Sequence, residues 1–493
     1  MKNLIHKVRS VFLFLKPKKE VVSLQNGNND IEYSLKNDSV LKLLYAFVGP
    51  AVLGLLINAL YNFVDRIFVG QFIGAEGLSA VTLAFPVTLF QFGLVLLFGS
   101  GSGILIAKFL GEQRTDKAED ALGNVIAGLL ITIVVFTTAG LLFYRPLLVA
   151  FGAQGTLLSL SSEYLMIIIM GFPLSFFLAL EFTCRAEGNP RLPAKLILLS
   201  SIINASLDYV FMKVFNMGIS GAAWATIIAQ ATNAILLIRY YVSGKSLVKL
   251  VWKKIRLKKH IILPVLSVGF APFIMDSAIS LQNVFANSLL LNSGGTDGVA
   301  AMGIIFGINV FFMMTALGTG DGMQPLISYN FGAKRYDRAA KTLEYALKMV
   351  SLVALSGIIL LEIFPSPIIS VFIDENENIL TITKIAIRIF AISIPFYMVQ
   401  IVMTRYFQAL QKNKIATFLA LLRPVLFVPI AYTLNNLYGL NGIWAAFVVS
   451  DSLAALISFL LIIKYSIHKL KLPSTNHTNE LLGNQVLTTK NNE

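Results

Sequence analysis

Polar side chains occur at helical spacing inside apolar segments that are long enough to cross a lipid bilayer. A carboxylate at that depth costs at least about 2.5 kcal/mol on insertion scales, so each one is treated as a functional residue. In one such segment the polar residues are three or four positions apart, which places them on one face of a helix. They are Asn58, Tyr61, Asn62 and Asp65.

Two later segments repeat this spacing. Asn204 and Asp208 are four residues apart, and so are Ala222 and Thr226. With a helical rise of about 1.5 Å per residue, Asp65, Asp208 and Thr226 all fall about 7 to 10 Å from the same membrane surface. We therefore expect the three helices to bring these residues into one layer.

The residue types in this layer suit a small cation or a proton. Carboxylate, amide and hydroxyl oxygens are the hard ligands that Na⁺ prefers. The Na⁺ ligands would be Asp65, Asn204, Asp208 and Thr226. The two carboxyl groups could instead share one proton, because two buried negative charges side by side are unfavourable. A purely structural alternative places Asp65 at the surface beside Arg66 and pairs Asp208 with Lys213.

The composition is that of a membrane protein. Of the 493 residues, 56% are hydrophobic and only 13% are charged, which does not fit a globular surface exposed to water. Apolar runs of the roughly 20 residues that cross a bilayer recur along the whole chain. We predict twelve transmembrane helices, near residues 45–69, 79–107, 121–143, 164–186, 193–215, 221–243, 262–292, 299–328, 343–364, 385–409, 415–436 and 440–466.

The two halves of the chain repeat one another. Phe98-Gly-Ser-Gly-Ser-Gly103 matches Leu317-Gly-Thr-Gly-Asp-Gly322, and Gly218-Ile-Ser-Gly221 matches Gly439-Leu-Asn-Gly442. An even number of spans per half gives both halves the same orientation, so the repeat is a parallel one. The sequence therefore predicts an all-α integral membrane protein with two six-helix lobes.

The basic residues indicate the orientation. With a cytoplasmic N-terminus, all but six of the 40 Lys and Arg residues lie on the cytoplasmic side, as the positive-inside rule requires. The net charge of +14 follows from this distribution, so we expect the lipid bilayer and no nucleic acid as a partner. We predict a multi-pass protein of the bacterial cytoplasmic membrane with both termini in the cytoplasm. The six exceptions are Arg66, Arg145, Lys213, Lys384, Arg388 and Arg423.

Polar segments divide the chain into five regions. We expect a cytoplasmic N-terminal segment, a first lobe, a cytoplasmic linker, a second lobe and a disordered cytoplasmic tail. Within the first region, the apolar run Val11–Leu15 could lie on the membrane surface. The regions are residues 1–40, 41–243, 244–260, 261–466 and 467–493.

The sequence offers few residues for enzymatic chemistry. The four histidines lie outside the spans or at their ends, and Cys184 is the only cysteine. No haem, zinc, iron–sulfur or disulfide framework can be built from that set. Gly99–Gly103 lacks the Lys-Ser/Thr pair of a phosphate-binding loop. We therefore expect that the protein is not an enzyme.

Several motifs together resemble those of multidrug and toxic compound extrusion (MATE) transporters. Tyr61–Gly70 is similar to the signature of the first span, and further matches follow in order: Arg185–Pro190, Asn204–Asp208, Gly218–Thr226 and Gln324–Ala333. The resemblance extends over residues 40–466 and thus over all twelve predicted spans. It implies two lobes in a V around a central cavity. It also implies export of bulky amphiphilic, often cationic compounds in exchange for H⁺ or Na⁺.

The resemblance also implies roles for individual residues. The cation site of the first lobe would consist of Asp65, Asn204, Asp208, Ala222 (through its carbonyl group) and Thr226. We expect Asp276 to attract cationic substrates, the protein to be a monomer, and no cofactor beyond H⁺ or Na⁺ as the coupling ion. The expected cavity residues are Asn58, Tyr61, Asn62, Gln91, Asp276, Asn283 and Asn287.

The proposed cation site is not duplicated in the second half. When Pro50 is set against Pro272, Asn287 and the Ile430–Ala431 pair stand opposite the two acids. This favours the subgroup of the family that couples through the first lobe alone. For most other polar residues in the spans we expect hydrogen bonds between helices. These include Glu181, Asp321, Arg405, Arg423 and Asp451.

Two other functions fit the same architecture. One is a related flippase-like or metabolite transporter with a narrow physiological cargo, and the other is a channel or structural membrane protein. A lipid flippase would need a strongly basic cavity, whereas these spans contain few cations. A channel gives no reason for a carboxylate pair confined to one lobe.

Overall fold

The computed structural model describes residues 35, 37–151, 153–370 and 377–470. The segment before residue 35, with the surface helix expected near Val11–Leu15, lies outside the described residues, and so does the tail beyond residue 470. Every regular element in the described part of the chain is a helix. Apolar helices suit a bilayer because each one satisfies its own backbone hydrogen bonds.

The first bundle extends from α3 to α9. Its fourth span changes from an α-helix to a 3₁₀-helix and back, and its fifth ends in one turn of π-helix, η2. The elements are α3 (Val40–Phe72), α4 (Ala75–Gly111), α5 (Thr115–Ala150), α6 (Gly155–Ser175), η1 (Phe176–Ala179), α7 (Leu180–Ala186), α8 (Arg191–Asp208), η2 (Tyr209–Val214) and α9 (Ile219–Val242).

The second bundle follows a linker that contains the short helix η3 (Trp252–Lys254). Its first helix, α10, holds two spans, because the chain breaks at Gly295 with φ 59°. That left-handed conformation favours glycine. The elements are α10 (Lys259–Gly332), α11 (Tyr336–Ile363), α12 (Pro365–Ile369), α13 (Glu377–Ala391), α14 (Ile394–Ala409), α15 (Asn413–Tyr438) and α16 (Leu440–Leu470).

The helices agree with twelve spans. Within the described residues, ten helices are long and apolar enough to cross a membrane, and the bent pair Leu380–Ala391 and Ile394–Ala409 makes eleven. The part of α10 before Gly295 supplies the remaining span. Most helices extend beyond the apolar run that predicted them, because hydropathy marks only the part inside the hydrocarbon region.

The internal repeat is visible in the backbone. The loop after α4 places Gln113 at φ 58°, and the matching loop after α10 places Lys334 at the same angle. Few residues other than glycine adopt this conformation. Its occurrence at equivalent positions confirms that the two halves are copies of one unit.

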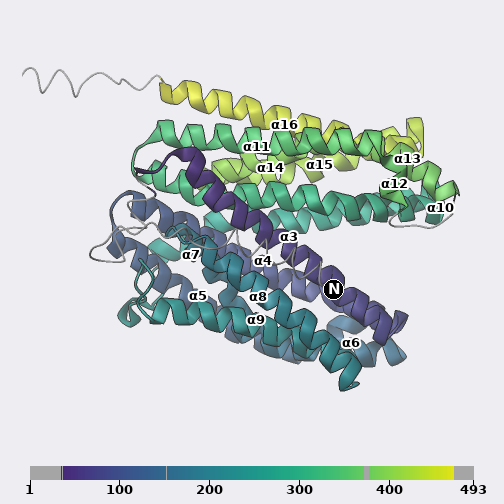
Figure 1. Ribbon diagram of the computed structural model, residues 1–493, viewed down its shortest axis with the longest axis horizontal. Coiled ribbons are helices and arrows are strands. Elements are labelled where there is room, and N and C mark those ends of the chain that lie inside the picture. The colour runs from purple at the N-terminus through teal and green to yellow at the C-terminus, as the bar shows by residue number, and fades with distance from the viewer. Residues whose placement is uncertain (1–34, 36, 152, 371–376, 471–493) are drawn as a thin grey trace, which may run out of the picture.

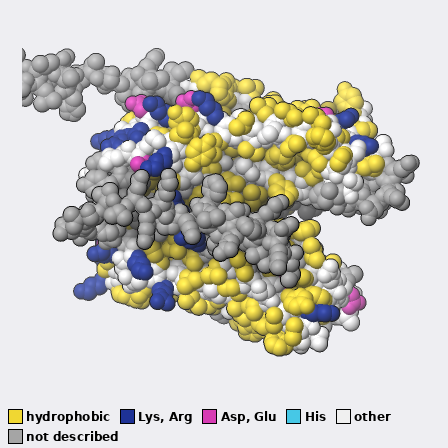
Figure 2. Space-filling model, in the orientation of Figure 1, with side chains coloured by type: hydrophobic (Ala, Val, Ile, Leu, Met, Phe, Trp, Pro, Cys, Tyr) yellow, Lys and Arg dark blue, Asp and Glu magenta, His cyan; other side chains and the backbone are white. Residues whose placement is uncertain are grey.

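The two bundles lie side by side and diverge toward the end that carries α6 and α13 (Figure 1). We call the opposite end, with the loops after α4, α7, α9, α10 and α14, the basic end, because Lys and Arg side chains gather toward it (Figure 2). The bundles touch mainly through α10, which packs against α3 and α4.

Backbones of the two bundles come closest in the half of the molecule near the basic end. A Cβ atom on Gly269 of α10 would lie 1.8 Å from the carbonyl oxygen of Leu97, and one on Gly322 would lie 2.6 Å from Cα of Val48. Only glycine permits such an approach. The structure therefore holds the basic end closed.

Candidate functional site: a carboxylate pair in the first bundle

Asp65 and Asp208 interact directly through their carboxyl groups. Asp65 lies near the end of α3, and Asp208 is the last residue of α8. Both side chains are buried, with 8% of Asp65 and 0% of Asp208 exposed. The structure thus brings together the two acids that the helical spacing had placed in one layer.

Asn204 lies one turn before Asp208 on the same helix and is 1% exposed. Neither atom of its side-chain amide has a hydrogen-bond partner among the described residues. Both carboxyl oxygens of Asp208 and Oδ1 of Asp65 also have no hydrogen-bond partner among the described residues, apart from the contact between the two acids. Buried polar groups are normally paired, so this cluster lacks a partner that a ligand could provide.

The other two predicted ligands lie on α9. Ala222 is fully buried in the first turns of this helix, and Thr226 is half-buried one turn further on. α9 packs against α8, and both helices contact α3. The predicted ligands therefore come from three neighbouring helices, as we expected from the sequence.

The chain changes its helical geometry immediately after Asp208. Residues Tyr209–Val214 form a π-helix, which has a wider turn than an α-helix. Single turns of this kind occur often at functional sites. Neither hydropathy nor residue spacing indicated this turn.

The structure does not show the alternative arrangement, in which Asp65 lies at the surface beside Arg66 and Asp208 pairs with Lys213. The ammonium group of Lys213 lies 5.7 Å from the centre of the Phe72 ring and forms no ion pair with Asp208. Arg66 is exposed and stacks over Phe85 at 5.4 Å, whereas Asp65 is turned inward. Neither acid is neutralised by the basic residue proposed for it.

Tyr164 is a member of this site that the sequence did not indicate. It lies on α6, is 7% exposed, and is close enough to Asp65 and Asp208 to interact with them electrostatically. Ile167 and Ile168, the residues that follow it at helical spacing, are apolar, so the spacing of polar residues did not single it out. Only the packing of α6 on the other helices could reveal it.

The predicted cavity residues occupy different environments. Asn58 and Tyr61 of α3 and Asn283 of α10 are half-buried, and Asn287 is exposed. Gln91 is buried and donates a hydrogen bond to Ser175 Oγ at 3.1 Å, which joins α4 to α6. The side chains of Asn62 and Asp276 lie outside the described part of the structure.

Buried acids of the second bundle have arginine partners instead. Asp451 of α16 accepts from Arg423 Nε at 2.6 Å, and Asp321 of α10 lies 3.5 Å from Arg405 of α14. In the first bundle, Glu181 accepts a hydrogen bond from Asn233 at 2.9 Å. These contacts confirm the expected bonds between helices. They also distinguish the Asp65–Asp208 pair, whose buried charge has no such partner among the described residues.

The cluster could hold a small cation or a proton. Two carboxyl groups in contact repel one another when both are ionised, unless a cation lies beside them or a proton lies between them. The oxygens of Asp65, Asp208 and Asn204 suit Na⁺ by type. No group of three or more His, Cys, Asp or Glu side chains forms a metal-binding cluster within the described residues.

Comparison with known proteins gives a consistent family assignment. The family model described as MatE matches residues 50–210 and 272–433. The chain is similar to the multidrug export protein MepA of Staphylococcus saprophyticus, with 25% identity over 433 residues, 87% of this chain and 95% of that protein. MepA of Staphylococcus aureus is 25% identical over 436 residues, with the same coverage.

Solved structures of similar fold cover nearly the whole chain. One is an outward-facing conformation of a multidrug resistance MATE family transporter of the MOP superfamily, with a TM-score of 0.85 and 23% identity over 91% of this chain and 100% of that chain. Another is a MOP superfamily transporter from Pyrococcus furiosus, with a TM-score of 0.82 and 22% identity over 89% of this chain and 98% of that chain.

Proposed function

Because the chain belongs to the MatE family of membrane transporters, we propose that it is a secondary active exporter of bulky amphiphilic, often cationic compounds. Inward movement of H⁺ or Na⁺ would drive the export. The protein would act as a monomer in the cytoplasmic membrane, with both termini in the cytoplasm. Similarity to proteins named multidrug export protein supports this class of cargo.

The observation that carries the proposal is the direct contact between Asp65 and Asp208 in a cluster with unpaired polar atoms. Such a cluster binds a cation or a proton and releases it when the surrounding helices move. Thr226 and the carbonyl group of Ala222 would complete the set of ligands. A transporter can use that cycle because binding of the ion then alters the packing of α3, α8 and α9.

Exchange requires that ion and cargo each change the affinity for the other. The closed basic end supports an outward-facing state, in which the ion site could be reached from the far side. An alternation between this state and an inward-facing one would need the contacts between α10 and the helices α3 and α4 to separate. Pro50 in α3, Pro86 in α4 and Pro272 in α10 are positions at which these helices can bend.

Transport by the purified protein in liposomes tests the proposal. Liposomes loaded with a fluorescent organic cation are given a proton gradient, a sodium gradient or neither, and release is recorded. We expect release to depend on one of the two gradients in the wild type and to be lost in Asp65→Asn. Equal release without a gradient would contradict coupled export. Gradient-dependent uptake of a single metabolite, with no response to organic cations, would instead favour the narrow-cargo transporter.

A further inference from the structure

A cavity lies at the basic end, where one loop of each bundle meets the other. Its volume is about 510 Å³, which is within the range of sites that hold small organic ligands. One wall is the end of α4 with the loop after it, and the other is the end of α10 with the loop after it. The lining residues are 111–114, Tyr329 and 332–335. We call this space the junction cavity. Because its walls belong to different bundles, it is complete only while the basic end is closed.

The lining of the junction cavity carries more positive than negative charge. Its cations are Arg114, Lys334 and Arg335, and Glu112 is the one acid among the described lining residues. Glu112 is already shared by two cations, since its carboxylate lies 3.8 Å from Lys108 Nζ and 3.7 Å from the Arg114 guanidinium. Lys334 is exposed and has no ion-pair partner among the described residues. An anion in the cavity would therefore meet an excess of positive charge.

The acids that follow the two loops do not change this balance. Asp116 and Asp337 occupy the first turns of α5 and α11, but both are exposed and neither lines the cavity. Arg338, one residue after Asp337, is close enough to Arg335 for the two cations to interact electrostatically. Like charges side by side repel each other, and an anion beside them offsets that repulsion.

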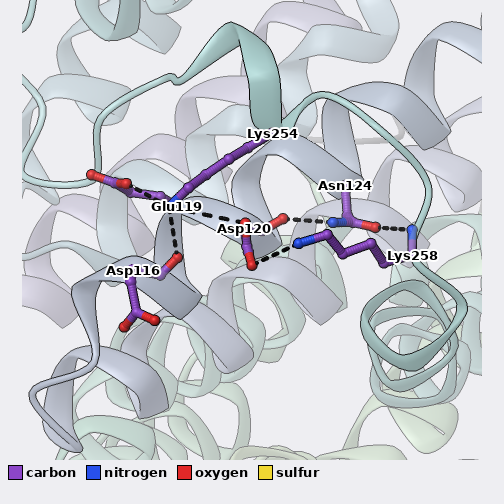
Figure 3. A network of polar contacts seen from close by, with 6 residues as sticks. All are labelled: Asp116, Glu119, Asp120, Asn124, Lys254 and Lys258. Atoms are coloured by element: carbon purple, nitrogen blue, oxygen red, sulfur yellow. Dashed lines mark hydrogen bonds and ion pairs between the residues drawn. The ribbon is translucent and has the colours of Figure 1, made fainter.

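Other basic residues at the same end are neutralised within the protein. Lys254 Nζ of the linker donates to Glu119 Oε2 at 2.8 Å, and Lys258 Nζ donates to Asp120 Oδ2 at 2.9 Å (Figure 3). These pairs fasten the linker to α5. Positive charge is therefore paired along this part of the linker, whereas it stays in excess in the junction cavity.

The two loops place their arginines at equivalent points of the cavity wall. Gln113 and Lys334 both have φ 58°, and the arginines that follow them share a backbone conformation, with ψ 65° at Arg114 and 66° at Arg335. An arginine side chain can donate two parallel hydrogen bonds to one phosphate group. With one such residue from each bundle, a phosphate-bearing ligand can bind both bundles at once.

We propose that the junction cavity binds a phosphate-bearing anion and that the bound anion holds the basic end closed. A phosphate group carries a charge of about −1.5 to −2 near neutral pH. That charge complements the lining, whose three cations and one acid give a net +2. A ligand that touches both bundles binds the closed arrangement more tightly than the open one, and so shifts the equilibrium toward the closed state. The binding rests on the cavity alone. Its consequence, slower export when the anion is abundant, rests on the proposed function.

Thermal unfolding of the purified protein in sodium pyrophosphate tests the binding step. We expect pyrophosphate to raise the thermal midpoint in a saturable way, beyond the effect of sodium chloride at the same ionic strength. Lys334→Gln should raise the half-maximal concentration several-fold. Glutamine already stands at the equivalent position of the other loop, Gln113, with the same φ, so this variant should fold. Lys249→Gln, at an exposed position of the linker, is the control with the same loss of charge. Equal half-maximal concentrations in the two variants would overturn the proposal.

A lipid headgroup could supply the same phosphate group, so the measurement is repeated in nanodiscs with and without phosphatidic acid in phosphatidylcholine. If a dissolved anion is the ligand, pyrophosphate acts equally in both kinds of disc. If a headgroup occupies the cavity, phosphatidic acid itself raises the thermal midpoint of Lys249→Gln more than that of Lys334→Gln, and it weakens the response to pyrophosphate. Either result supports a phosphate site. A wild type that responds to neither source would reject it.

Distances between spin labels on the two bundles at the basic end test the second step. Pyrophosphate should increase the population with the short distance in the wild type, and should do so less in Lys334→Gln at the same concentration. Binding without a change in this population would overturn the claim that the anion holds the basic end closed. Both measurements are made without transport, so their failure is distinct from a failure of the proposed export, which the liposome assay tests.

Discussion

Gly111 at the end of α4 lies against Tyr329 of α10 so closely that a Cβ atom on Gly111 would be 2.0 Å from the Tyr329 carbonyl oxygen. The repeat-related Gly332 stands in the same relation to Lys108, at 2.1 Å. The glycine that ends the second span of each lobe is thus used to pack the lobes together. Two copies of one motif meet around a pseudo-twofold axis at the basic end.

Gly111→Ala should weaken this closed contact. The added methyl group must displace the α10 backbone, and overpacking of this kind costs about 1 to 3 kcal/mol. We expect a lower thermal midpoint in detergent and more frequent opening of the basic end, measured as distances between spin labels on the two lobes. Gly303→Ala is the matched control, because nothing lies within 4 Å of a Cβ atom there. Equal effects of the two substitutions would contradict the packing argument.

Asp65→Asn and Asp208→Asn should each reduce gradient-driven export at least about tenfold, because each removes one half of a shared ion site. The double variant should be little worse than either single variant, since the site is already lost. Glu76→Gln, in the exposed first turn of α4, is the control for a carboxylate outside the site. Losses that multiply in the double variant would show that the two acids act separately.

Tyr164→Phe should change the ion dependence of transport without abolishing it. The substitution keeps the ring and removes the hydroxyl group, whose interactions are worth about 0.5 to 1.5 kcal/mol. A shift of several-fold in the proton or sodium concentration for half-maximal transport is the expected result. If the hydroxyl group has no part in the site, that concentration will be the same in Tyr164→Phe and the wild type.

The spacing of polar residues was sufficient to predict members of the site that share a helix or lie at the same depth in the membrane. The four-residue spacing of Asn204 and Asp208, and the depth of Asp65, predicted a common layer, because helical geometry fixes both. Tyr164 and the π-helical turn after Asp208 could not be predicted in this way. They depend on how separate helices pack, and a single sequence carries little record of that packing.

The linker between the two bundles shows a similar limit of prediction from sequence. Its residues 253–259 are rich in lysine and arginine, and two of them, Lys254 and Lys258, are paired with acids of α5. Charge composition does not distinguish a partner in the membrane from one in the protein. Glu187 was visible only as part of a family-like motif, and its contact with Ser246 depends on the return of the chain after α9.

The pH dependence of stability should differ between the wild type and Glu187→Gln. The pKa of Glu187 is raised from its usual 4.5 to about 7 in the folded protein, so the folded state binds its proton more tightly than the unfolded state does. This contribution to stability is fully present below about pH 4.5 and is lost as the pH rises toward about 7. It amounts to no more than about 3 kcal/mol. The thermal midpoint of the wild type, measured relative to Glu187→Gln, should therefore decrease as the pH is raised from about 5 to about 8.

Glu76→Gln should show no such trend, since it alters an exposed side chain. A midpoint difference between the wild type and Glu187→Gln that rises with pH would mean that Glu187 is ionised in the folded protein.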